Sequence, residues 1–139
     1  MNVAAAALRR RRPFRDNSRR LSVSELNRRE LERYLERVTD RWPVQRALLG
    51  GARVDDLHGA PPQRERGQEY VLVLVSEHFD GVPWLERVYQ AASLWDALEM
   101  GAAADVHCYT PAEFERKREQ LRVVRHVAED GLELLPEPA

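Results

Sequence analysis

The chain has 139 residues, a formal net charge of -1 and 43% hydrophobic residues, values typical of a single globular domain large enough to bury a core. A net charge this close to zero argues against a protein that binds nucleic acid over its whole surface. The only cysteine, Cys108, excludes an internal disulfide framework, and no apolar run approaches the length of a membrane span. These features predict a cytoplasmic protein that is not associated with a membrane.

Residues 1–21 are predicted to form a disordered, Arg-rich tail, followed by one folded domain over residues 22–135 and a loose C-terminus over residues 136–139. Residues 1–20 contain seven Arg and one Asp, a charge of +6, which leaves -7 for the rest of the chain. No helical or strand period in the tail would bury an apolar face, so the tail should not fold alone. A targeting segment that resembles an organellar transit peptide and a simple disordered extension both remain open. A basic tail of this kind can also bind nucleic acid, through residues 9–20.

The first predicted helix runs from about Val23 to Asp40. A capping box of Ser22 and Glu25 should start it, and Pro43 should end it. Apolar side chains that recur at steps of three and four residues define its inward face. These side chains are Leu31, Tyr34, Leu35, Val38 and Trp42.

A short strand is expected over residues 44–49, ended by Gly50 and Gly51. Residues 52–67 have no period and contain several Gly, Pro and Asp residues, which predicts a long loop. Residues 71–75 form the most hydrophobic run of the chain. Because both faces of this run are apolar, it should be a central strand that is covered on two sides.

The next predicted helix begins at Pro83 and ends before Gly101. The two Trp residues of this helix are interpreted as core anchors rather than as a stacking platform for a ligand. The side chains expected on its inward face are Trp84, Leu85, Val88, Ala92, Trp95 and Leu98.

A strand follows that runs straight into a helix. Alternation places Asp105, His107 and Tyr109 on one face of the strand and Val106 and Cys108 on the other. On the second face the thiol of the cysteine should behave as a small buried hydrophobe.

The helix after this strand has a strong start signal. Thr110 is placed as the N-cap, Pro111 as the first helical residue, and Glu113 completes a capping box. A break is expected near Arg122, and residues 132–134 should form a last edge strand. The order of elements predicts an α+β fold, sandwich-like, in which helices pack on a small mixed sheet.

Several motifs together resemble a known family. They are Leu48-Leu49-Gly50-Gly51-Ala52-Arg53, then Phe79, Trp84 and Arg87, then Asp105 followed by Tyr109-Thr110-Pro111-Ala112-Glu113-Phe114, and finally Gly131-Leu132. Over residues 26–135 the chain resembles the minimal nucleotidyltransferase family of the polymerase-beta-like nucleotidyltransferase superfamily. In that family a Gly-Ser turn is followed by Arg, a strand begins with Asp-x-Asp, and a later strand carries a third Asp before Tyr-Thr-Pro-x-Glu-Phe.

The resemblance implies a nucleotidyltransferase-like fold with Mg²⁺ and a nucleoside triphosphate as cofactors. Laying the apolar strand on the family's strand puts Glu69 at the first Asp and Val71 at the second, while Asp105 matches the third. Glu69 and Asp105 are therefore the candidate catalytic residues and metal ligands, because Mg²⁺ takes hard oxygen ligands.

The glycine turn is the implied phosphate-binding element. Gly50, Gly51 and Arg53 are the candidate cofactor-binding residues, since glycines let main-chain amides approach phosphate oxygens closely. Arg53 has two open interpretations, a phosphate contact and a residue that merely flanks the turn.

The chain departs from the family at decisive positions, because Val71 cannot ligate a metal and Gly51 lacks the family's hydroxyl. The first interpretation is a catalytically impaired protein that acts as a binding or regulatory, antitoxin-like module, with a small helical, toxin-like protein as partner. A second is an active Mg²⁺-dependent enzyme that transfers adenylyl groups to a protein or RNA and recruits Asp55, Asp56 or Glu65 as a replacement ligand. A third is a nucleic-acid-associated protein that uses its Arg-rich tail.

Two candidate side chains also have purely structural interpretations. Asp105 can be a solvated or capping carboxylate, and His107 can be a hydrogen-bonded structural residue.

Overall fold

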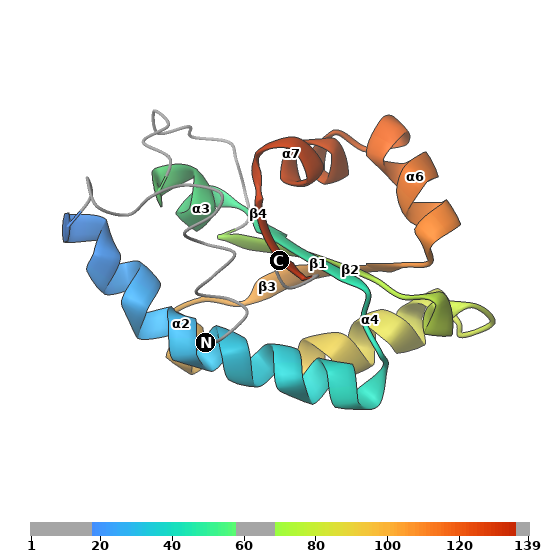
Figure 1. The fold of residues 1–139 in the computed structure, drawn as a ribbon, viewed down its shortest axis with the longest axis horizontal. Helices are drawn as coiled ribbons and strands as arrows, with labels where there is room; N and C mark the ends of the chain where they lie inside the picture. Colours follow the sequence, from blue (N-terminus) through green and yellow to red (C-terminus); the bar gives the residue numbers. More distant parts are fainter. Residues whose placement is uncertain (1–17, 58–68, 136–139) are drawn as a thin grey trace.

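The computed structural model of the chain describes residues 18–57 and 69–135 (Figure 1). The predictions made for residues 1–17, for residues 58–68 and for the C-terminal residues 136–139 lie outside the described residues. The elements are α2 (Ser18–Arg41), β1 (Arg46–Gly50), α3 (Ala52–Leu57), β2 (Tyr70–Val75), the 3-10 turn η1 (Glu77–Phe79), α4 (Trp84–Ser93), α5 (Ala97–Met100), β3 (Ala104–Tyr109), α6 (Pro111–Gln120), α7 (Arg122–Asp130) and β4 (Leu132–Leu135).

The four described strands form one mixed sheet in the order β3-β2-β1-β4. Strand β1 is antiparallel to both β2 and β4, whereas β2 and β3 are parallel. Helices α2 and α4 lie on one side of this sheet, and α6 and α7 lie on the other (Figure 1). The predicted α+β fold, a small mixed sheet with helices packed on it, is therefore confirmed.

Strand β2 is the centre of the molecule, as its unbroken apolar sequence predicts. All six of its residues are buried. Leu72 and Leu74 face the layer of α2 and α4, while Val71 and Val73 face the layer of α6 and α7. The sheet thus separates two hydrophobic cores, and this is why its central strand needs no polar face.

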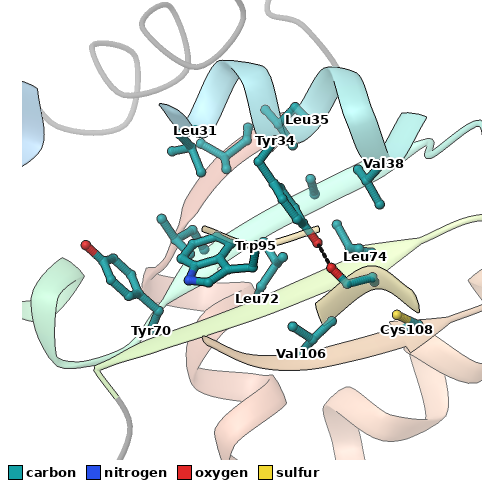
Figure 2. Close-up of a cluster of buried hydrophobic side chains, with 14 of the residues drawn as sticks. Leu31, Tyr34, Leu35, Val38, Tyr70, Leu72, Leu74, Trp95, Val106 and Cys108 are labelled. Atoms are coloured by element: carbon teal, nitrogen blue, oxygen red, sulfur yellow. Dashed lines mark hydrogen bonds between the residues drawn. The ribbon is translucent and has the colours of Figure 1, made fainter. Parts of the chain in front are cut away.

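The larger core is built around the predicted apolar stripe of α2 (Figure 2). Tyr34 and Val38 have no exposed surface, and the Tyr34 hydroxyl donates to the main-chain oxygen of Ala91 in α4 at 2.9 Å. The Tyr34 and Trp95 rings meet edge to face with centroids 5.2 Å apart. These contacts confirm the inward face that the helical period predicts.

The start of α2 differs from the prediction. The helix begins at Ser18, so Ser22 lies within it and cannot be the N-cap of a helix that starts near Val23. The Ser22–Glu25 pattern has the right spacing for a capping box. A capping box forms only where the chain before it leaves helical geometry, and here the helix continues.

The single helix predicted from Pro83 to Gly101 is in fact two helices. Asp96 interrupts it, because its side chain accepts a hydrogen bond from the main-chain nitrogen of Glu99 and caps α5. The main-chain oxygen of Leu94, freed by the break, accepts from Arg37 of α2 at 2.7 Å. The inward placement of Leu85 and Leu98 is therefore wrong. Their side chains are 76% and 91% exposed.

The predicted loop over residues 52–67 is also partly wrong, because its first residues form the short helix α3 (Ala52–Leu57). Helix α3 starts directly after Gly51, whose φ of 105° reverses the chain at the end of β1. Val54 anchors the helix with 2% exposure. Together with Ala52 it is one of two buried residues among the described side chains of α3, and two such residues within a turn and a half give too weak a period to be recognised from sequence.

The second half of the chain follows the prediction more closely. Helix α6 begins with the full capping box, in which Thr110 and Glu113 exchange hydrogen bonds, and the chain breaks at Leu121 before α7. Strand β4 pairs with β1 at the edge of the sheet. Leu121 lies at this break and is 38% exposed.

Candidate functional site

The turn after β1 has no room for a side chain at either of its glycines. A Cβ atom added to Gly51 would lie 2.6 Å from the main-chain oxygen of Glu69, and one added to Gly50 would lie 2.7 Å from Val127. Gly51 also has a φ that L side chains rarely adopt. The serine that the resembling family carries at this position would therefore not fit here without displacing the start of β2.

Arg53 lies one residue into α3 and is held by two hydrogen bonds to its own chain. Its Nε donates to Glu69 Oε1 at 2.8 Å, and a terminal nitrogen donates to the main-chain oxygen of Gly101 at 3.2 Å. The hydrogen bond to Glu69 raises the pKa of the Arg53 guanidinium above its usual value. Arg53 and Glu69 thus tie the glycine turn to the start of β2.

Asp105, His107 and Tyr109 form a row along one face of β3. Asp105 Oδ2 lies 3.0 Å from Nε2 of His107, and Nδ1 of the same ring lies 2.9 Å from the Tyr109 hydroxyl. The arrangement is satisfied when His107 donates from Nε2 to the carboxylate and accepts the tyrosine proton at Nδ1. The imidazole is 14% exposed, so it is a hydrogen-bonded residue of the strand surface.

Val71 stands directly beside Asp105 in the parallel register of β2 and β3. Paired residues of neighbouring strands point to the same face of a sheet, so the position nearest to Asp105 on β2 carries hydrocarbon. Val71 is 3% exposed and packs in the smaller core with Leu48 and Val73.

The residues at this place do not fit a magnesium ion. Mg²⁺ requires several hard oxygen ligands in near-octahedral geometry. Glu69 is ion-paired to Arg53, Asp105 is hydrogen-bonded to His107, and Val71 has no ligand atom. Within the two described ranges, no three His, Cys, Asp or Glu side chains are grouped so that they could hold a metal.

Of the acidic residues considered as replacement ligands, Asp55 is the one whose side chain is described. The Asp55 carboxylate contacts Nε2 of His126 at 3.1 Å and so links α3 to α7. The side chain of Asp56 and the whole of Glu65 lie outside the described residues. The other nitrogen of His126 lies 3.3 Å from Asp130, so this histidine bridges two carboxylates.

A second polar site lies at the other end of β3. Arg87 of α4 is 6% exposed and donates to the main-chain oxygens of Val82 and Cys108 and to Glu113 Oε1, at 2.8, 3.1 and 2.7 Å. The hydrogen bond from Arg87 holds the pKa of the Glu113 carboxyl below its usual range. The guanidinium therefore joins the α4 side of the molecule to the start of α6 around the edge of the sheet.

An open pocket of about 510 Å³ lies over this ion pair. Trp84 and Tyr109 form one wall, stacked with ring centroids 5.2 Å apart and planes inclined by 27°. Arg116 and Lys117 of α6 and Leu121 at the α6–α7 junction also line the pocket. The core-anchor prediction holds for Trp95, at 8% exposure, but is wrong for Trp84, which is 40% exposed in the pocket wall.

Two groups near the pocket are unsuited to act as nucleophiles. Burial raises the pKa of the Cys108 thiol to about 12, so almost no thiolate forms at neutral pH. Burial likewise raises the pKa of Tyr109 to about 12. The expectation that Cys108 is a small buried hydrophobe is confirmed, since it has no exposed surface.

The sequence analysis missed the pocket but not all of its signals. Arg87 lies three residues after Trp84, on the face of α4 that also carries buried Ala91. A charged residue on an inward helical face needs a buried partner, and this spacing could have directed attention to an acidic residue elsewhere. Which acid would be the partner depends on how α4 and α6 meet, and no local pattern specifies that.

Comparisons of the chain with protein-family models, with curated proteins and with solved structures found no match. No helix in the described part of the chain is both long enough and apolar enough to cross a membrane.

Proposed function

We propose that the protein is a nucleotidyltransferase-like binding module that does not catalyse nucleotidyl transfer. The main support is the register of β2 and β3, in which Val71 lies beside Asp105. The resembling family has a carboxylate at the position of Val71, and a metal bound there would polarise the triphosphate. A buried isopropyl group supplies no oxygen ligand, so the reaction loses the charge that stabilises its transition state.

The state of the two candidate acids supports the same proposal. Glu69 is bound by Arg53, the one cation of the glycine turn that could meet a phosphate. Binding of a triphosphate would have to break this ion pair and the contact of Asp105 with His107. A regulatory, antitoxin-like role needs neither step, because neutralisation of a small helical partner by binding requires no metal and no nucleotide.

The test is transfer of label from α-labelled nucleoside triphosphates in the presence of Mg²⁺, with the chain itself, total RNA and a cell-protein fraction as acceptors. We expect no labelled product above a blank that contains the same acceptor but lacks the chain. Asp105→Ala should behave as the wild type in this assay, and so should Asp80→Ala, a matched loss of an exposed carboxylate at the end of η1.

Robust labelling that is lost in Asp105→Ala and retained in Asp80→Ala would overturn the proposal. It would establish the alternative, an active Mg²⁺-dependent enzyme with a ligand drawn from outside the described residues.

A further inference from the structure

The pocket between α4 and α6 carries positive charge that the described chain does not neutralise. Glu113 is the only acidic residue that lines it, and this carboxylate is already paired with Arg87. Among residues 28–55 and 69–135, whose side chains are described, neither Arg116 nor Lys117 has an ion-pair or hydrogen-bond partner for its side chain. Arg116 and Lys117 therefore line a pocket in which the charge of the acidic residue, Glu113, is already neutralised by Arg87.

Trp84, Tyr109 and Leu121 supply the apolar part of the lining. Tyr109 is 2% exposed and lies behind Trp84, whose uncovered surface faces the pocket. Trp84 is held in place by its stack on Tyr109 and by the Arg87 guanidinium 5.9 Å from its ring centroid. Leu121, 38% exposed, adds a further apolar side chain to the lining.

The polar groups at the base of the pocket are already satisfied. Both nitrogens of His107 are engaged, one by Asp105 and the other by Tyr109. Arg87 uses its donors on two main-chain oxygens and Glu113. Charge recognition is therefore left to the α6 cations, and shape recognition to the indole and the leucine.

We infer that this pocket is a binding site for a small organic anion, a phosphate or carboxylate attached to a flat apolar group. The anion would lie against Arg116 and Lys117, and the flat group against Trp84. The pocket volume of about 510 Å³ lies within the range of small-molecule sites. Phosphate and carboxylate oxygens form strong charge-assisted hydrogen bonds with Arg and Lys, and aromatic faces attract flat groups.

The inference does not rest on the proposed function. The site lies at the C-terminal end of β3 and uses none of Glu69, Val71 or Asp105 as a lining residue. It requires no metal, so it can be tested in a buffer that contains EDTA. Failure of this test would leave the proposed function untouched, and the discovery of nucleotidyl transfer would leave this site untouched.

The experiment is isothermal titration of the full chain with phenyl phosphate, in a low-salt buffer without phosphate or divalent cations. Benzoate replaces the phosphate by a carboxylate, while inorganic phosphate and phenol each supply one half of the recognised chemistry. Fluorescence reports on the same event, because Trp84 is exposed whereas Trp42 and Trp95 are only 5% and 8% exposed.

We expect phenyl phosphate to bind with a dissociation constant on the order of 1 mM and to quench fluorescence. Benzoate should bind when the carboxylate is the recognised anion. Inorganic phosphate and phenol should each bind at least roughly tenfold more weakly than whichever of phenyl phosphate and benzoate binds more tightly. Arg116→Gln and Lys117→Gln should each weaken binding roughly three- to tenfold. Arg29→Gln, the same change on an exposed α2 residue, should leave binding unchanged.

Absence of binding by both aryl anions at concentrations on the order of 10 mM would overturn the inference. Equal weakening by Arg29→Gln would also overturn it, because the affinity would then reflect net charge alone. Trp84→Leu provides a further check. It should weaken both aryl anions and abolish quenching, and unchanged binding in this variant would refute the role of the indole.

Discussion

The buried ion pair between Arg87 and Glu113 makes a quantitative prediction about stability. Arg87→Met keeps the length of the side chain but removes the guanidinium, which is 7% exposed in the pair. The variant loses four hydrogen bonds, two of them to main-chain oxygens and two to the Glu113 carboxylate, the weaker of these at 3.5 Å. Removal of one partner of a buried pair typically costs about 3–5 kcal/mol.

The expected cost here lies at the lower end of that range. Glu113 is 30% exposed, so water can partly solvate its charge after the substitution. The carboxylate also keeps its hydrogen bond from the main-chain nitrogen of Thr110, at 2.9 Å. We expect Arg87→Met to lower the free energy of unfolding by about 3 kcal/mol, or the urea midpoint by about 1.5 M for a slope of about 2 kcal/mol per molar.

The pH dependence of this difference has a defined sign. The pKa of Glu113 is lowered in the folded chain, chiefly by the hydrogen bond from Arg87. A carboxyl with a lowered folded pKa stabilises the protein above its unfolded pKa, about 4.3, and loses this contribution as the pH falls through the folded value. The gap between wild type and Arg87→Met should therefore be full at pH 7 and shrink as the pH falls below about 4.

Urea unfolding followed by circular dichroism at several pH values measures both effects. Arg116→Met, an exposed arginine of α6, is the matched control and should change stability by less than about 0.5 kcal/mol. A double-mutant cycle of Arg87→Met with Glu113→Gln should give a coupling of about 1–2 kcal/mol. The reasoning fails if the free energies of unfolding of Arg87→Met and the wild type differ by less than about 1 kcal/mol at pH 7. It also fails if this difference stays the same at acid pH.

Two further substitutions test the turn and the larger core. Gly51→Ala should lower the free energy of unfolding by about 2 kcal/mol or more, because both its φ of 105° and a main-chain oxygen 2.6 Å away oppose a Cβ atom. Gly81 has a φ of 81°, but a Cβ atom added there would meet no atom within 4 Å, so the control Gly81→Ala should cost only about 1 kcal/mol. Equal effects of the two glycine substitutions in thermal unfolding would refute the steric argument. Tyr34→Phe should cost about 1 kcal/mol, since it removes the 2.9 Å hydrogen bond to the main-chain oxygen of Ala91 and leaves this buried acceptor only the 3.3 Å bond from the main-chain nitrogen of Leu94; a neutral result in the same measurement would contradict that role.

The parts of the fold that sequence reasoning predicts are those specified by local chemistry. Residues 71–75 must be a central strand because no polar side chain interrupts them, and all are buried. The start of α6 follows from Thr110 and Glu113, which satisfy each other's main-chain groups without outside help. Such elements need no knowledge of what packs against them.

The parts that sequence reasoning misses depend on partners distant in the chain. The break between α4 and α5 is stabilised by Arg37, which binds the freed oxygen of Leu94 from α2. Apolar periodicity alone extends the helix through the break and places Leu98 inward, although it is 91% exposed. Helical period likewise cannot distinguish a Trp84 that faces a core from one that faces a pocket.

At the candidate site, too, the sequence predicts one part of the arrangement, and contacts between distant residues decide the other. The order of motifs along the chain locates Glu69, Val71 and Asp105, and the register of β2 with β3 places Val71 beside Asp105. The engagement of Glu69 by Arg53 could not be foreseen, because it depends on how α3 folds back on the start of β2. Whether the nucleotidyltransferase resemblance extends to function is the question that the labelling assay answers.

The position of the Arg87 guanidinium also affects how other chains could meet this sheet. Strand β3 lies at the sheet edge, and the main-chain oxygen of Tyr109 accepts from Ser76 on the inner side. Because successive carbonyls alternate in direction, the oxygen of Cys108 points outward, where Arg87 occupies it. A strand from another chain that paired with β3 could not donate to the Cys108 oxygen, because Arg87 already does so. Blocking an acceptor on an edge strand is one way in which proteins avoid edge-to-edge association of their sheets.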